Sequence, residues 1–177
     1  PDYSSAASDV YKRQAYGEAK AKLFRRAGLD VAIINIDDAF GRELTGRTNA
    51  KRVLTYGIES DTADISAAAI QTTPIGSRFQ LRIKGSSRSA ECRLLGDFNL
   101  SNLLAVSGWL QDLGHSLDSI VEILPKLEPP PGRLECVSAP RGALFIDFAH
   151  TPDAVQSTLK TIAQHYSGRI ITVIGLS

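Results

Sequence analysis

The C-terminal part of the chain carries the pattern that most restricts its fold. The apolar run 143–146 predicts a strand buried on both faces, and Thr151 and Pro152 form a cap and first-turn pair for a helix at 154–165. Residues 169–174 predict another strand. Strand, loop, helix and strand in this order make a β-α-β unit, whose strands lie parallel. We therefore expect an α/β fold whose parallel sheet needs more strands than remain before Ser177.

The preceding residues also alternate between strand and helix patterns, which supports the same fold class. The short apolar run 31–34 predicts a buried strand, and residues 79–83 and 90–94 alternate apolar and polar side chains as in a hairpin that turns at 85–87. The other expected elements are a helix at 16–27, a polar helix or loop at 39–49, a strand at 53–58, a helix between Gly96 and Gly114 with Leu113 on its apolar face, a helix at 117–124 capped by Ser116, and a connector at 129–132.

Residues 1–14 fit none of these patterns. They mix Ser, Ala and charged residues without a helical or strand period, and the chain contains no Met. We expect these residues to be a non-native leader and exclude them from the fold.

Composition excludes several classes of partner. Lys and Arg total 20 against 19 Asp and Glu, so no net field attracts nucleic acid or an anionic membrane. No apolar run approaches the roughly 20 residues of a membrane span, and the leader lacks the apolar core of a signal peptide. With only two cysteines, far apart in the sequence, a cytoplasmic protein is expected.

Asp147 and His150 stand where open α/β sheets bind ligands, at the carboxyl end of a predicted strand and before a helix. An Asp at this place can accept hydrogen bonds from ribose hydroxyls. The alternative is that Asp147 merely ends the strand and that Asp153 complements the helix dipole.

The segment IDFAHTPDAVQSTL, residues 146–159, resembles the start of the C-terminal domain in the Mur ligase family, most closely the MurE type, whose pattern is D-Y-A-H-T-P-D. Only Phe148 departs from it. The resemblance implies that Asp147 helps hold the ATP ribose, with His150 nearby. It also implies that 15–138 is the C-terminal part of a central ATP-binding domain and 139–177 the truncated start of a Rossmann-like C-terminal domain.

A second segment, GDFNLSNLLA at 96–105, is similar to the family pattern G-x-F-N-x-x-N-x-L-A. Its Asn99 and Asn102 are three residues apart, a spacing that places both amides on one helix face. An amide can pair with both the donor and the acceptor edge of adenine, and the family uses this segment at the nucleotide. The alternative for Asn99 is helix capping.

Two further segments match the family. PPPGRLECV resembles its G-R-M-E linker, which implies that Arg133 meets phosphate oxygens through its forked guanidinium. YGEAKAKLF, residues 16–24, is similar to Y-x-x-A-K-x-x-L-[FY], in which the Lys is carbamylated. Lys20 then offers an anionic oxygen to Mg²⁺, and Lys22 lies on the surface. Taken alone, an Arg in a proline-rich loop such as Arg133 is more often a solvated charge, and the alternative for Lys20 is a solvated helix lysine.

The resemblance implies an ATP- and Mg²⁺-dependent ligase of peptidoglycan precursor synthesis, acting as a monomer. ATP phosphorylates the D-glutamyl carboxylate of UDP-MurNAc-L-Ala-D-Glu, and a diamino acid, diaminopimelate or lysine, attacks the acyl phosphate. The 177 residues contain no G-x-x-G-K-T phosphate loop, so we expect this chain alone to be inactive. Two alternatives stay open: another ligase of the superfamily, such as a folylpolyglutamate synthase, and a non-enzymatic nucleotide-binding protein.

Overall fold

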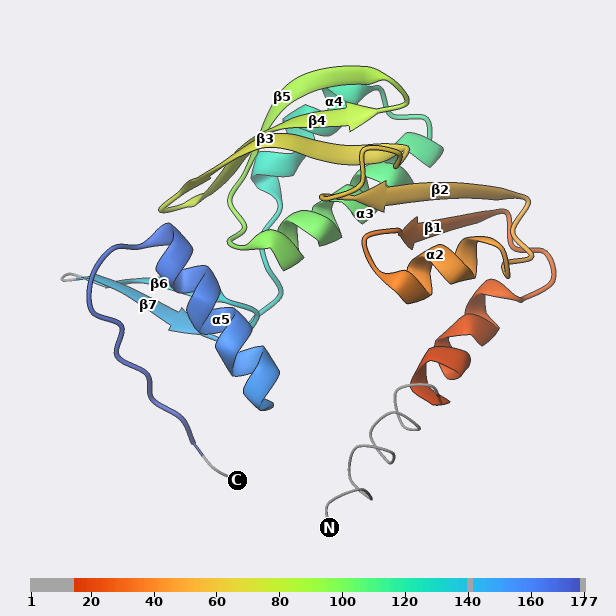
Figure 1. The fold of residues 1–177 in the computed structure, drawn as a ribbon. Coiled ribbons are helices and arrows are strands. Elements are labelled where there is room, and N and C mark those ends of the chain that lie inside the picture. Colours follow the sequence, from red (N-terminus) through yellow and green to blue (C-terminus); the bar gives the residue numbers. More distant parts are fainter. Residues whose placement is uncertain (1–14, 140–141, 176–177) are drawn as a thin grey trace, which may run out of the picture.

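The computed structural model describes residues 15–139 and 142–175, which form a larger N-terminal unit and a smaller C-terminal unit (Figure 1). The larger unit is built on a five-stranded sheet in the order β1-β2-β3-β4-β5. The first three strands are parallel and the last three antiparallel. Their bounds are β1 Val31–Asn35, β2 Arg52–Gly57, β3 Ile65–Thr73, β4 Gly76–Ile83 and β5 Ser86–Cys92.

Helices cover both faces of the parallel part of the sheet. On one face, α3 (Asp97–Asp112) and α4 (Leu117–Ile123) enclose the main core, which includes Leu81, Leu104 and Ile120. On the other face, α2 (Ala39–Thr45) and a helix over residues 15–24 pack against β1. Strand β1 is thus covered on both faces, as its unbroken apolar run predicts.

The predicted hairpin of β4 and β5 is confirmed, but its turn lies one residue earlier than expected. Lys84 and Gly85 have φ values of 48° and 81°, as in a two-residue type I′ turn. Ser86 and Ser87 are already paired in β5, opposite Ile83 and Arg82. The difference arises because Lys84 adopts the left-handed conformation that its side chain disfavours.

Strand β3 is not predicted from the sequence. Its sequence, ISAAAIQTT, lacks both clear alternation and an aliphatic run. It is nevertheless the strand that joins the two halves of the sheet, parallel to β2 and antiparallel to β4. The register shifts between Ala68 and Gln71, where Ala69 has a φ of 50°, and this bulge explains the broken period.

The boundaries of the predicted helices shift by a few residues. The N-terminal helix ends at residue 24 rather than 27, whereas α3 begins at Asp97, directly after Gly96 as predicted. Leu113, assigned to the apolar face of α3, follows its last turn and is 58% exposed. Ser116 caps α4 as predicted, because its hydroxyl accepts a hydrogen bond from the Ser119 N–H. A 3-10 turn, Leu124–Lys126, follows α4.

The C-terminal unit departs furthest from expectation. It contains β6 (Glu135–Ala139), β7 (Gly142–Ile146) and α5 (Pro152–His165). Strand β7 pairs only with β6 among the described residues, in antiparallel orientation, and most of its side chains are exposed. The expectation of a buried strand at 143–146 is therefore wrong here, since its apolar side chains have no second layer on their outer face.

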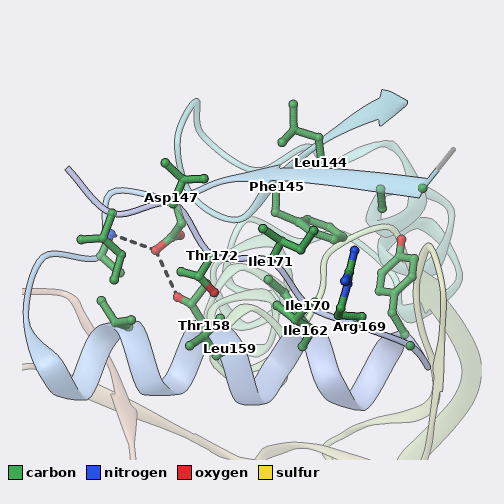
Figure 2. A pocket seen from close by; sticks show the side chains of 18 of the residues that line it. Leu144, Phe145, Asp147, Thr158, Leu159, Ile162, Arg169, Ile170, Ile171 and Thr172 are labelled. Carbon is green, nitrogen blue, oxygen red and sulfur yellow. Dashed lines mark hydrogen bonds between the residues drawn. The ribbon is translucent and has the colours of Figure 1, made fainter. Parts of the chain in front are cut away.

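The predicted strand at 169–174 is also absent, so the β-α-β unit does not close. This segment has no strand hydrogen bonds, and Val173 is 93% exposed. Figure 2 shows the pocket of about 670 Å³ that it borders together with β7 and α5. The cap and first-turn pair Thr151 and Pro152 is confirmed, with the Thr151 hydroxyl accepting from the Ala154 N–H.

The α/β fold class is confirmed by this arrangement of helices on a mixed sheet. Within the ranges 15–139 and 142–175, none of the helices combines the length and apolar character needed to cross a bilayer.

Gly41 is a position at which the fold leaves no room for a methyl group. A Cβ there would lie 1.7 Å from the Asn35 carbonyl oxygen at the end of β1. We predict that Gly41→Ala lowers the free energy of unfolding by about 1–3 kcal/mol through overpacking. The measurement is urea denaturation followed by circular dichroism.

Gly46→Ala is the matched control, because it lies at the end of the same helix and a Cβ there meets only the Glu43 carbonyl oxygen at 3.8 Å. Its unfolding midpoint should equal or exceed that of the unsubstituted chain, since Ala restricts the unfolded state. Equal midpoints for both variants would contradict the close packing of α2 on β1.

Candidate functional site

The Asp147 carboxylate is the centre of the candidate site. Its Oδ2 accepts a hydrogen bond from the Leu134 N–H at 2.8 Å. Its Oδ1 accepts from the Ala149 N–H at 2.9 Å and from the Thr158 hydroxyl at 3.1 Å. Figure 2 shows Asp147 reaching from the end of β7 toward Thr158 on α5. The carboxylate therefore ties together the linker before β6, the loop after β7 and the helix that follows.

The linker segment 132–134 is held against the loop after β7 by backbone contacts as well. The Phe148 N–H donates to the Gly132 carbonyl at 2.9 Å, and the Gly132 N–H donates to the Glu135 carboxylate at 3.0 Å. A Cβ on Gly132 would lie 2.4 Å from the Phe148 ring, and the φ of Gly132 is +70°. Only glycine fits this close approach.

Arg133 lies between two fixed neighbours. Leu134 is 3% exposed and has a φ of 51°, an unfavourable conformation for a leucine that persists where surrounding contacts enforce it. Here the enforcing contacts are its burial and its hydrogen bond to Asp147. The Arg133 side chain is exposed and has no hydrogen-bond or ion-pair partner among the described residues. The structure thus brings the predicted Arg133 and Asp147 segments together.

His150 is exposed and belongs to the same loop. Its Nδ1 lies 2.9 Å from the Phe148 carbonyl oxygen. Because a carbonyl only accepts, Nδ1 carries the proton, which leaves Nε2 as an acceptor in the neutral ring. His150 and Arg133 are therefore two polar side chains presented to solvent from one hydrogen-bonded pair of segments.

The two asparagines of α3 have different environments, although their spacing of three keeps them on one side of the helix. Asn99 is buried, 6% exposed, and its Nδ2 donates to the Leu95 carbonyl at 3.0 Å. Asn102 is exposed. Gly96, rather than Asn99, is the N-cap residue of α3, so the capping alternative is also wrong in its simple form. Asn102 is the amide open to a ligand.

The carboxyl end of β1 supports α3 through a hydrogen bond between two side chains. The Asn35 Nδ2 donates to the Ser101 hydroxyl at 3.2 Å, directly beside Asn102. Burial raises the pKa of the nearby Tyr56 phenol, and its hydrogen bond with Ser101 lowers the pKa by a smaller amount. Asp37 accepts from three consecutive backbone N–H groups, the first at 2.7 Å from Ile58.

Lys20 is on the helix 15–24, which lies beside β1 and α2 at the β1 end of the sheet (Figure 1). Its ammonium group is exposed and lies 4.3 Å from the centre of the Tyr16 ring. Lys22 is on the surface, as expected. No three His, Cys, Asp or Glu side chains gather into a possible metal site within the part of the chain that the structure describes.

Comparison with known proteins adds independent information on this arrangement. Residues 9–110 match the Mur ligase middle domain, and residues 132–177 match the Mur ligase, glutamate ligase domain. The chain is 38% identical over 163 residues to UDP-N-acetylmuramoyl-L-alanyl-D-glutamate–2,6-diaminopimelate ligase of Ectopseudomonas mendocina, an alignment covering 92% of this chain and 34% of that protein. The chain thus spans about a third of the length of the curated relatives it matches.

Solved structures show the same fold. A structure of a UDP-N-acetylmuramoyl-L-alanyl-D-glutamate–2,6-diaminopimelate ligase superposes with a TM-score of 0.75 and 37% identity, covering 87% of this chain and 32% of that chain. The MurF ligase of Thermotoga maritima in complex with ADP superposes with a TM-score of 0.69, covering 83% of this chain and 34% of that one. At 18% identity, the second match supports the fold alone.

Asp147→Asn tests the central role of the carboxylate. An amide nitrogen cannot accept a hydrogen bond, so at least one of the donors on Leu134, Ala149 and Thr158 loses its acceptor. We predict a loss of about 1–3 kcal/mol of local stability. The measurement is amide hydrogen exchange at Leu134 and Ala149, which should become faster.

Asp153→Asn is the control, because Asp153 is an exposed carboxylate in the first turn of α5. Its loss removes only a favourable interaction with the helix dipole, about 0.3–1 kcal/mol. The two amides should keep their exchange rates in this variant. If both substitutions accelerated amide exchange at Leu134 and Ala149 equally, the Asp147 carboxylate would not be what holds these segments together.

Proposed function

This chain belongs to the Mur ligase family, and from that premise we propose that it forms part of an ATP-dependent amide-bond ligase of peptidoglycan precursor synthesis. The ligase adds a diamino acid to UDP-MurNAc-L-Ala-D-Glu. The observation that carries the proposal is the 38% identity, over nearly the whole chain, to a ligase named for this reaction. The name of that relative favours diaminopimelate over lysine as the diamino acid.

We assign the nucleotide-binding roles to the exposed side chains around the candidate site. Arg133 meets the phosphates, because a guanidinium forks onto two oxygens and nothing described in this chain engages it. Asn102 reads the adenine edge, and Asn99 fixes the first turn of α3 from within. His150 lies at the nucleotide through its free Nε2.

Asp147 has a double role in this proposal. A carboxylate has about four lone-pair sites, and three are filled by Leu134, Ala149 and Thr158. The remaining site accepts a ribose hydroxyl. The ribose contact and the geometry of Arg133 then depend on the same carboxylate.

Lys20 is proposed as the carbamylated lysine. The ammonium group first releases one proton to become an amine, and the amine then adds CO₂ with loss of a second proton, which forms an N–C bond and turns a cation into a carboxylate-like anion. Because the described residues hold no acidic cluster, a Mg²⁺ ion would rely on the carbamate oxygens and on substrate phosphates. When bound, Mg²⁺ would neutralise charge on those phosphates.

The proposed division of the chain follows from the family resemblance, although the structure groups the whole of β6, from Glu135, with the C-terminal unit, and the match to the second domain begins at residue 132. Residues 15–138 belong to the central ATP-binding domain, and residues 139–177 begin the C-terminal domain. Residues 1–14, proposed as a non-native leader, lie outside the described residues, and the Mur ligase middle domain match overlaps this segment from residue 9. We further propose that the ligase works as a monomer in the cytoplasm, in keeping with its two free cysteines, Cys92 and Cys136.

ATP titration of the 177-residue chain, followed by backbone NMR, tests the assigned site. We predict weak binding, because the phosphate loop is missing from these residues, and no ligase turnover. Amide signals of 99–102, 133 and 147–150 should shift together, whereas those of the Lys84 and Gly85 turn stay in place. Asn102→Ala should reduce the shifts.

Gln111→Ala is the control, since it removes another amide from α3, far along the helix from Asn102. ATP-induced shifts confined to other surfaces, or amide-bond formation by the chain alone, would contradict the assignment.

Carbamylation of Lys20 is tested with ¹³C-labelled bicarbonate. We predict one carbamate signal in the ¹³C NMR spectrum at mildly alkaline pH, where more of the amine is deprotonated. The signal should disappear in Lys20→Ala and persist in Lys22→Ala, which removes an exposed lysine from the same helix. A signal that depends on Lys22 would refute the assignment.

A further inference from the structure

The end of α5 joins the C-terminal unit to the start of α3 through a buried histidine. His165 is 7% exposed, and its ring contacts two backbone groups of the larger unit. The Nε2 atom accepts a hydrogen bond from the Gly96 N–H at 3.1 Å, and Nδ1 lies 2.7 Å from the Thr73 carbonyl oxygen. The next residue, Tyr166, donates its hydroxyl proton to the Pro74 carbonyl.

These two contacts define one tautomer of the ring. The Thr73 carbonyl can only accept, so Nδ1 carries the proton, and the Gly96 N–H can only donate, so Nε2 carries none. A neutral imidazole satisfies both contacts at once. Neither an ammonium nor a hydroxyl could replace it, since the site demands a donor and an acceptor on opposite sides of one rigid ring.

The backbone at Gly96 is shaped to receive this helix. Its φ is +84°, and a Cβ there would lie 2.6 Å from the Thr161 Cγ2 on α5. Gly96 is also the N-cap residue of α3, and no side chain caps the helix there. The Asn99 and Leu100 N–H groups donate to the Gly96 carbonyl at 3.1 Å each, so the position of Gly96 sets the first turn of α3.

We propose that His165 is a positioning residue of the nucleotide site. It fixes Gly96, and through it the first turn of α3 with Asn99 and Asn102, relative to the C-terminal unit that carries Arg133 and His150. This inference rests on the proposed ATP-binding role of those residues. His165 itself lies at the far end of α5 from His150, so it acts through the backbone without touching the nucleotide.

The length of α5 sets the distance between the two parts of the proposed nucleotide site. Helix α5 has 14 residues, about 21 Å at 1.5 Å per residue. Asp147 holds the first half of this helix through Thr158, and Gly96 holds its last turn through His165. The helix is therefore a spacer with both ends fixed.

The tautomer is tested first, on the full 177-residue chain. Long-range ¹H–¹⁵N spectra distinguish Nδ1–H from Nε2–H, and the chain has three histidines. His115→Gln and His150→Gln identify the remaining signal as His165. We expect the Nδ1–H form. An Nε2–H form would overturn the proposal, because Nε2 could then not accept from Gly96.

Three substitutions then separate the two hydrogen bonds. His165→Phe keeps a ring and removes both. His165→Gln places an amide oxygen near the Nε2 position, whereas His165→Asn offers an amide donor near the Nδ1 position. Gly96 amide exchange should become about tenfold faster with Phe and Asn, as expected for one lost hydrogen bond, and should be restored with Gln.

ATP-induced shifts at Asn99 and Asn102 provide the functional measurement. We expect them to weaken in the Phe and Asn variants and to recover in the Gln variant, with His115→Gln as the unaffected control. Equal shifts in all variants, or unchanged Gly96 exchange in His165→Asn, would overturn the positioning role. If the unsubstituted chain shows no ATP-induced shifts, the proposed function fails, while the tautomer and Gly96 exchange still decide the His165 contact.

Discussion

The candidate site depends on the hydrogen bonds that the Asp147 carboxylate accepts from three directions. They hold Leu134 in a left-handed conformation that an isolated leucine avoids. Because Arg133 directly precedes Leu134 in the chain, this conformation also fixes the position of the Arg133 backbone. A side chain at position 147 that accepts fewer hydrogen bonds would leave a part-buried donor without an acceptor, which costs more than a hydrogen bond contributes. Asp147 therefore has a structural role in holding the linker, the loop and α5 together. The proposed hydrogen bond to the ribose would be a second role of the same carboxylate.

The proposed nucleotide site draws its residues from both units of the chain. The parallel strands provide α3 with a support at Ser101, and α5 provides the connection at Gly96. Both contacts reach the same first half of α3, from opposite units. The asparagine segment is thus positioned by its neighbours rather than by a cap of its own.

Secondary structure is predicted well from the sequence where the apolar periodicity is strong. It is predicted poorly where contacts with residues distant in the sequence determine the conformation. Strand β1 and the β4–β5 hairpin follow from their apolar patterns, and the motifs around Asn102, Arg133 and Asp147 follow from family resemblance. Strand β3 is not predicted, because a bulge interrupts the alternation of its side chains. The strand at 169–174 is predicted from its composition, but a strand needs a hydrogen-bonded partner, which composition does not reveal. His165 was missed because a single histidine near a helix end has no pattern; only the structure shows two backbone groups facing its ring.

The long separation between His165 and its partners bears on the order in which the chain assembles. Contacts inside the C-terminal unit join residues 11 to 13 positions apart, such as Asp147 with Thr158 and Leu134. The His165 contacts close loops of 69 and 92 residues. Loop closure of that length is entropically unfavourable until both surfaces exist, so docking of α5 should be a late kinetic step. Refolding observed at Gly96 should then lag behind refolding observed at Leu134.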